Sequence, residues 1–179
     1  MLTQKSSQIP EIKKIYEINE TELNELQILT TDIRKKYVPD DSFFHDSPDL
    51  PDYLLSDERP SIVVIALGDP ADEYPELQYN GHTLMGFFGT NFFSYERLKE
   101  YSPWMDKDKK PMSVCYDRIY TAPPFRGNGV AKKLLHYMED VLKNKGYGNM
   151  EMKPDQFLKK WLVQEGFKPI SEDRYNKSL

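Results

Sequence analysis

The sequence predicts a mixed α/β domain over residues 1–179, with a mixed central sheet flanked by helices. Two observations lead to this class. Strand-like segments such as 61–67 (SIVVIAL) alternate with amphipathic helical segments, of which 129–145 is the clearest. The strand–helix–strand unit over 112–152 predicts a right-handed parallel crossover. A chain of this length buries roughly 70% of its unfolded surface, so it needs no disulfides to hold a core.

The first half of the chain predicts one helix and several strands. Residues 13–19 alternate as a strand does, and 21–37 carry apolar residues at helical spacing after a cap at Asn19 or Thr21. Pro39 ends that helix. The remaining segments are an acidic, proline-rich loop (39–60), strands at 61–67 and 82–93 joined through a tight Asn80-Gly81 turn, an irregular stretch (94–111) and a longer strand (112–121).

The second half predicts two helices, each followed by a strand. The helix over 129–145 has lysines in its last turn and ends at Gly146. A short strand follows at 147–153. Asp155 is expected to cap the next helix, which carries Phe157, Leu158, Trp161 and Leu162, and the final strand is expected at 166–170.

Composition argues against several classes of protein. The net charge is −5 and no basic run exceeds three residues, so a nucleic-acid-binding stripe is not expected. No apolar stretch reaches the length of a membrane span, and the first residues have no apolar core, so neither a span nor a signal peptide is expected. The single cysteine, Cys115, fits a reducing cytoplasm, as a buried strand residue in preference to a nucleophile. The three histidines lack the partners that a metal site needs.

The segment RIYTAPPFRGNGVAKKLL (118–135) carries the strongest functional signal. A strand breaks at two prolines, and an arginine and two glycines precede a helix. Helix N-termini present unpaired N–H groups and bind phosphates, and Gly127 and Gly129 would let a phosphate approach the backbone. Neither a Walker loop nor a three-glycine dinucleotide fingerprint is present. By itself this turn fits a phosphate site and a plain strand–helix connection equally well.

The surrounding residues resemble the GNAT acetyltransferase superfamily. Arg126, Gly129 and Ala131 match its signature of arginine or glutamine, two residues, glycine, one residue, and glycine or alanine. Gly166 and Phe167 match its second signature, a helix that ends in a Gly-Phe pair. The resemblance is good over about 112–170. It implies a sheet with a splayed strand pair that takes the pantetheine of acetyl-CoA like an added strand.

This resemblance also implies the cofactor-binding residues. Backbone groups at the end of the strand would pair with pantetheine, and amides of the turn and helix start would hold the diphosphate. The residues expected are Ile119, Tyr120, Thr121, Arg126, Gly127, Asn128, Gly129, Val130, Ala131 and Lys132.

The catalytic residues are harder to assign. Asp117 and Glu151 are candidate general bases, each weighed against an ordinary exposed or salt-bridged carboxylate. Many members carry a tyrosine five residues before the Gly-Phe phenylalanine, and here Leu162 stands there. Tyr120, Tyr116 or another tyrosine replaces it, the thiolate leaves unassisted, or the domain only binds acyl-CoA as a sensor or interaction module.

The acceptor is expected to be an amine of a small molecule or peptide. The loop over 39–60 places aspartates beside Phe43, Phe44 and Tyr53, which suits a cationic amine, although a solvated acidic loop explains the same composition. The aspartates concerned are Asp40, Asp41, Asp46, Asp49 and Asp52. No nucleic-acid or membrane partner is expected. The sequence allows a homodimer but does not specify one.

Overall fold

The computed structural model describes residues 11–37, 61–92, 112–115, 119–154 and 156–179, and all statements below concern this part of the chain. The strands are β1 (Ile12–Glu17), β2 (Ser61–Gly68), β3 (Gln78–Tyr79), β4 (His82–Phe92), β5 (Met112–Cys115), β6 (Ile119–Thr121), β7 (Asn149–Met152), β8 (Lys168–Pro169) and β9 (Tyr175–Ser178). The helices are α1 (Glu20–Tyr37), α3 (Val130–Asn144) and α4 (Gln156–Gln164), and the 3-10 turns are η3 (Pro75–Leu77) and η4 (Pro123–Phe125).

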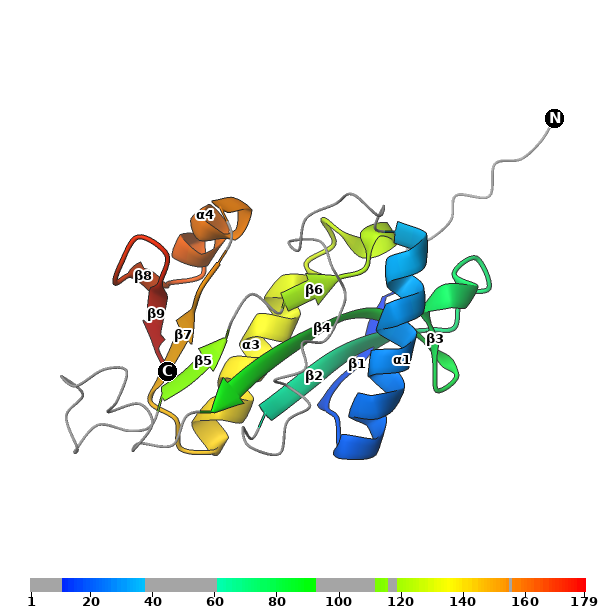
Figure 1. The fold of residues 1–179 in the computed structure, drawn as a ribbon, viewed down its shortest axis with the longest axis horizontal. Helices are drawn as coiled ribbons and strands as arrows, with labels where there is room; N and C mark the ends of the chain where they lie inside the picture. The colour runs from blue at the N-terminus through cyan, green and yellow to red at the C-terminus, as the bar shows by residue number, and fades with distance from the viewer. Residues whose placement is uncertain (1–10, 38–60, 93–111, 116–118, 155) are drawn as a thin grey trace.

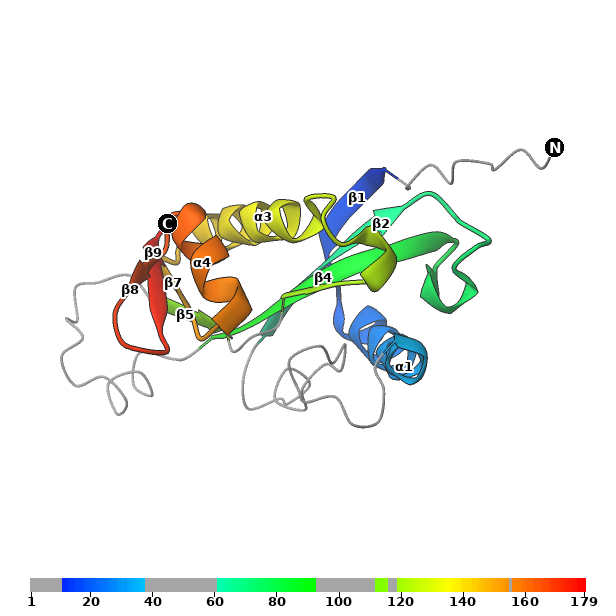
Figure 2. The same ribbon diagram turned by 90° about the horizontal axis from the view of Figure 1, so that it is seen from above.

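The strands form one mixed sheet in the order β1-β2-β4-β5-β7-β9-β8, and β3 and β6 pair with β4 outside this path (Figure 1). Among the described strands only β5 and β7 pair in parallel, so the predicted parallel pairing across α3 is confirmed. Figure 2 shows α1 on one face of the sheet and α3 and α4 on the other. The predicted fold class, a mixed sheet flanked by helices, is therefore the one observed.

Helix α1 begins with a reciprocal cap. The Asn19 side-chain oxygen accepts from the Glu22 N–H at 3.0 Å, and the Glu22 carboxylate accepts from the Asn19 N–H at 3.0 Å. This is a capping box, with Asn19 rather than Thr21 as the cap. Leu26, Thr30 and Ile33 lie on the buried face. Their spacing of four and three residues is the helical periodicity that predicted this element.

Helix α3 packs on the sheet through one apolar stripe. Its buried apolar residues are Val130, Leu134, Leu135, Met138 and Leu142. The helix ends as predicted at Gly146, which has φ +88°. The Gly146 N–H donates to Lys143 O and the Tyr147 N–H to Leu142 O, which is the Schellman arrangement.

Two predicted strands differ in the structure. Of the strand expected over 112–121, the described residues form β5 and β6; both pair with β4, and β5 also pairs with β7. The strand expected over 166–170 is reduced to β8, because Gly166 and Phe167 complete the C-terminal cap of α4. β8 pairs with β9, a strand not predicted from the sequence.

The Asn80-Gly81 turn is confirmed by φ values of +48° and +74°. It joins β3 to β4, where Tyr79 pairs with His82. These values fit a type I′ hairpin turn. The loop expected over 39–60 and the irregular stretch over 94–111 lie outside the described residues.

Candidate functional site

The sheet opens between β6 and β7. β5 pairs with β7 from Met112 opposite Asn149 to Cys115 opposite Met152. Beyond this point β6 pairs with β4, and Figure 1 shows β7 turning away toward α4. The splayed strand pair expected from the resemblance is therefore present. One edge of β6 faces the opening, because β4 occupies its other edge.

The register of β6 decides which backbone groups face the opening. The Ala122 N–H donates to Met85 O at 2.9 Å, next to the pair of Thr121 with Gly86. Because hydrogen-bonded and non-hydrogen-bonded pairs alternate along an antiparallel ladder, the backbone groups of Tyr120 point toward β4. Those of Ile119 and Thr121 point away from β4. Of the three predicted pantetheine contacts, only these two have backbone groups directed to the opening.

Thr121 adds a further polar group at this edge. Its hydroxyl oxygen is buried and has no hydrogen-bond partner among the described residues. Its carbonyl accepts from the Arg126 Nε–H at 3.2 Å, which ties the arginine to the end of β6. The two outward-facing backbone positions fit the amide-rich pantetheine arm.

Gly86 lets β6 and α3 approach β4 closely. A Cβ on Gly86 would lie 2.4 Å from Tyr120 O, 3.2 Å from Val130 Cγ1 and 3.3 Å from Leu134 Cδ1. Any side chain there would push both elements outward. The glycine therefore places the first turn of α3 beside the end of β6, where the predicted ligand contacts converge.

The connection from β6 to α3 leads into a helix whose first turn has no side-chain cap. Phe125 of η4 is buried, and the Asn128 amide donates to Phe125 O at 3.2 Å and to Arg126 O at 3.1 Å. The Asn128 side chain thus braces the turn, which leaves its backbone N–H for a ligand. Gly127 and Gly129 have φ values of +79° and +74°, which L side chains rarely adopt.

The start of α3 offers several N–H groups to an anion. The first intrahelical bond runs from the Lys133 N–H to Gly129 O, so the N–H groups from Gly129 to Lys132 precede it. No side chain of the described residues caps them, and no acidic residue lies in this turn. A Cβ at Gly127 or Gly129 would meet nothing within 4 Å, so the space beside the turn is open. These features fit a diphosphate.

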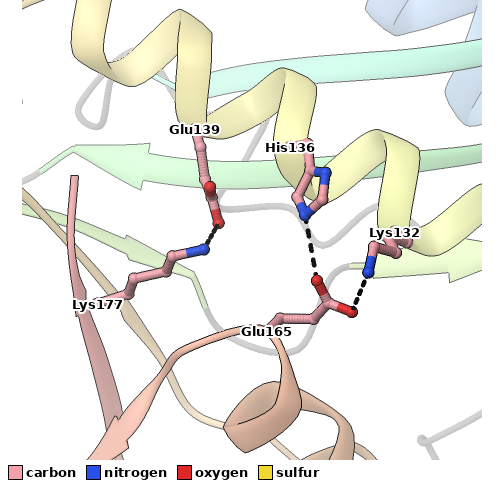
Figure 3. Close-up of polar contacts among 5 residues, drawn as sticks. All are labelled: Lys132, His136, Glu139, Glu165 and Lys177. Atoms are coloured by element: carbon pink, nitrogen blue, oxygen red, sulfur yellow. Dashed lines mark hydrogen bonds and ion pairs between the residues drawn. The ribbon is translucent and has the colours of Figure 1, made fainter.

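Lys132 is held at the edge of this turn by a carboxylate from elsewhere in the chain. Figure 3 shows its ammonium directed at Glu165, which follows α4, at 3.2 Å from Oε1. Glu165 Oε2 lies 3.1 Å from Nε2 of His136, which is half exposed. Burial by itself would raise the pKa of Glu165, but the hydrogen bonds and charges of Lys132 and His136 hold that pKa below its ordinary value.

The candidate catalytic residues have very different surroundings. Glu151 is buried on β7 and forms a close ion pair with Arg174, which is the salt-bridged alternative weighed for it. The Tyr120 ring is buried on the α1 side of the sheet with its centroid 5.3 Å from that of Phe87. Asp117, Tyr116 and the expected cap Asp155 lie outside the described residues.

Leu162 is fully buried, and its carbonyl accepts from the Phe167 N–H at 3.0 Å in the cap of α4. The leucine and the phenylalanine, also buried, occupy the positions that commonly form the apolar contact of this cap. The position therefore has a packing role in this chain, and it offers no proton to a leaving group.

Sequence reasoning did not find Glu165, Arg174 or Gly86. Arg174 pairs with Glu151, which lies 23 residues earlier in the sequence. Glu165 pairs with Lys132, which lies 33 residues earlier. No local pattern signals such pairs. Gly86 lies inside a strand, where an isolated glycine indicates close backbone approach, so this one signal was available.

Within the described ranges, no three His, Cys, Asp or Glu side chains are grouped so that they could hold a metal ion. In the same ranges, no helix combines the length and apolar character needed to cross a bilayer.

A splayed sheet with an uncapped, glycine-built helix start defines a class of domain suited to a ligand with an extended amide arm and a diphosphate. The model of the GNAT acetyltransferase family matches residues 30–160, and the chain belongs to this family. The family uses acetyl-CoA as its cosubstrate. No curated protein sequence matches the chain.

Solved structures share the fold at low sequence identity. A GNAT acetyltransferase from Staphylococcus aureus Mu50 is 16% identical, with a TM-score of 0.56 over 93% of this chain and 98% of that one. A GNAT acetyltransferase from Brucella melitensis in complex with acetyl-CoA is 13% identical, with a TM-score of 0.59 over 93% and 87%. An aminoglycoside acetyltransferase from an uncultured soil metagenomic sample, in complex with sisomicin, is 18% identical, with a TM-score of 0.53 over 89% of each chain.

Proposed function

We propose that the chain is a cytoplasmic N-acetyltransferase that transfers an acetyl group from acetyl-CoA to a primary amine of a small molecule or peptide. The observation that carries the proposal is the uncapped start of α3 at the end of a strand whose outer edge faces the opening of the sheet. Family membership supports the acetyl donor. The amine acceptor is supported by analogy with the aminoglycoside acetyltransferase that shares the fold.

The geometry supports a binding role for each part of this turn and strand. The N–H groups between Gly127 and Lys132 would hold the diphosphate, with the Lys132 ammonium beside them. The outward backbone groups of Ile119 and Thr121 would pair with the pantetheine arm. Acetyl-CoA supplies the activated acyl group as a thioester. The Ile119 N–H is our candidate donor to the oxyanion that forms when the amine attacks the thioester carbonyl.

The acceptor must lose a proton before it attacks. An alkyl amine with a pKa near 10.4 is neutral in only about one molecule in a few thousand at pH 7, a deficit of roughly 4–5 kcal/mol. Asp117 is our first candidate for the base. Glu151 is the weaker candidate, because the Arg174 guanidinium already occupies its carboxylate. Tyr120 is the candidate proton donor to the leaving thiolate.

The test is release of free thiol from acetyl-CoA over a panel of polyamines, aminoglycosides and peptide amines. Asp117→Asn should lower kcat by about 100-fold or more while leaving the dissociation constant for coenzyme A unchanged. Initial rates with both substrates varied should give intersecting double-reciprocal lines, as direct attack in a ternary complex requires. Parallel lines, with loss of activity in Cys115→Ala, would indicate an acetyl-cysteine intermediate instead.

A second candidate function is a non-catalytic domain that binds acyl-CoA as a sensor or interaction module. The buried Leu162 at the usual tyrosine position favours it. Tight binding of acetyl-CoA by calorimetry, with no thiol release on any amine, would support the sensor over the enzyme. Absence of any binding of coenzyme A at millimolar concentration would contradict both.

A further inference from the structure

Helix α3 is tied to the C-terminal part of the chain by two nearly buried carboxylates (Figure 3). Lys132, His136 and Glu139 follow one another at spacings of four and three residues, so they form one stripe along the helix. Glu165 pairs with the first two, and Lys177 of β9 pairs with Glu139 at 2.6 Å. The Glu165 and Glu139 side chains are only 9% and 8% exposed.

The backbone fixes the position of the Glu165 carboxylate. Its N–H donates to Trp161 O, and the next residue, Gly166, closes the cap of α4 with φ +92°. A carboxylate removed from water needs partners, and here Lys132 and His136 provide them. Both partners are about half exposed, so each depends on Glu165 for a defined position.

Lys132 is the partner that matters for a ligand. It belongs to the first turn of α3, and its N–H is among the groups that precede the first intrahelical bond. An exposed lysine populates many rotamers, and a cation that is already ordered loses less freedom when it meets an anion. The ammonium has three donors, so a bond to Glu165 leaves others for a phosphate.

We propose that Glu165 is a positioning residue for coenzyme binding: it holds the Lys132 ammonium beside the N-terminal turn of α3, where the diphosphate would lie. The inference rests on the proposed function, because that function places the diphosphate at this turn. Glu165 itself does not contact the coenzyme. Its effect on affinity therefore passes through Lys132 and concerns the phosphate end of the ligand.

The pair of Glu139 with Lys177 is the matched control. It joins the same helix to β9, also in the C-terminal part of the chain, through a carboxylate of similar burial. Glu139 lies seven residues after Lys132 in the sequence, about 10 Å farther along the helix from the coenzyme turn. A purely structural tie predicts that the two carboxylates have equivalent effects, whereas the proposal predicts that only Glu165 alters ligand affinity.

The experiment measures two halves of the coenzyme separately: ADP by calorimetry, and pantetheine as an inhibitor of thiol release or a competitor of coenzyme A. Lys132→Met should weaken ADP binding about tenfold, and Glu165→Gln about threefold. Neither substitution should alter the inhibition or dissociation constant of pantetheine. In the Lys132→Met background, Glu165→Gln should have no further effect on ADP. Glu139→Gln should lower the thermal midpoint without changing ADP affinity.

Several outcomes would overturn the proposal. These are an unchanged or tighter ADP complex in Glu165→Gln, an equal loss for ADP and pantetheine, or a full effect of Glu165→Gln without Lys132. Should Glu165→Gln not fold, Glu165→Asp keeps the charge and shifts the carboxylate by one methylene, and it should give a smaller loss confined to ADP. If wild-type protein binds no coenzyme A, the proposed function fails; binding that is indifferent to Glu165 refutes only this inference.

Discussion

Helices α1 and α3 begin in opposite ways. At α1, Asn19 and Glu22 satisfy each other's backbone N–H groups, and Glu20 and Glu22 place negative charge in the first turn. At α3, Gly129 stands in the cap position with φ +74°, no side chain caps the helix, and the first turn holds no acid. Both helices pack on the same sheet through apolar stripes, so the difference is confined to their first turns.

The different first turns of α1 and α3 suit different roles, one in the stability of the fold and the other in ligand binding. A helix start exposes N–H groups and a partial positive charge that some partner must satisfy. In α1 the partner is part of the local sequence, and the cap stabilises the fold. At the start of α3 the local sequence provides neither a capping side chain nor an acidic residue, so the N–H groups of the first turn have no local partner. A helix start without local partners is what a site for an external anion requires, and proteins tend to break local rules at functional sites.

The largest expected effect comes from Gly129→Val. A β-branched residue is strained at this positive φ, so the turn should shift and misalign its N–H groups. We expect coenzyme A affinity to fall by more than about 30-fold, measured by calorimetry, while circular dichroism stays close to wild type. Gly146→Val is the control, because Gly146 has a similar φ at the other end of α3. Equal losses of affinity in both variants would contradict the assignment.

Ala131→Glu should make the start of α3 resemble that of α1. The added carboxylate would stabilise the helix by about 0.3–1 kcal/mol and repel a diphosphate at the same turn. We expect coenzyme A binding to weaken about tenfold, and the loss to shrink at high salt. Ala131→Gln, which matches the size without the charge, should bind nearly as wild type does. If the glutamine variant lost as much affinity, sterics rather than charge would be responsible.

Asn19→Ala tests the other helix. Loss of the cap should lower the free energy of unfolding by about 1 kcal/mol, measured by chemical denaturation. Glu22 would keep its bond to the Tyr16 hydroxyl at 2.9 Å, so the loss should stay local. Coenzyme A affinity should not change. A variant with weakened binding would show that the two helix starts are coupled and would undo the comparison.

The smallest expected effect is on the stability of the fold at low pH. It concerns Glu165, whose carboxylate pairs with Lys132 and His136 of α3. Because the folded pKa of Glu165 is lowered, its stabilising contribution is present above the unfolded pKa of about 4.3 and is lost as pH falls through the folded value. The difference in unfolding free energy between wild type and Glu165→Gln should therefore be larger at pH 7 than near pH 3. A difference independent of pH would show that the charge of Glu165 does not contribute.

Features that depend on near neighbours in the chain could be predicted from the sequence. Helical spacing located α1 and α3, Asn80-Gly81 specified its turn, and Asn19 was one of two caps considered. The two glycines before α3, Gly127 and Gly129, could likewise be recognised from the sequence, because tolerance of a positive φ is a property of single residues. The caps, turns and helices obey these rules because their hydrogen bonds close within a few residues.

The pairing of the strands, their register and the long-range ion pairs could not be predicted from the sequence and became known from the folded structure. Several features depend on partners far away in sequence: the pairings of β5 and β6, the strand β9, and the pairs of Glu151 with Arg174 and Lys132 with Glu165. So does the direction of the Tyr120 backbone, which follows from the register with β4. A strand carries the same alternation whichever strand it pairs with, and a charged side chain gives no local sign of its partner. Pairing and register are set by the packing of the whole sheet, so they became known only when its strands were in place.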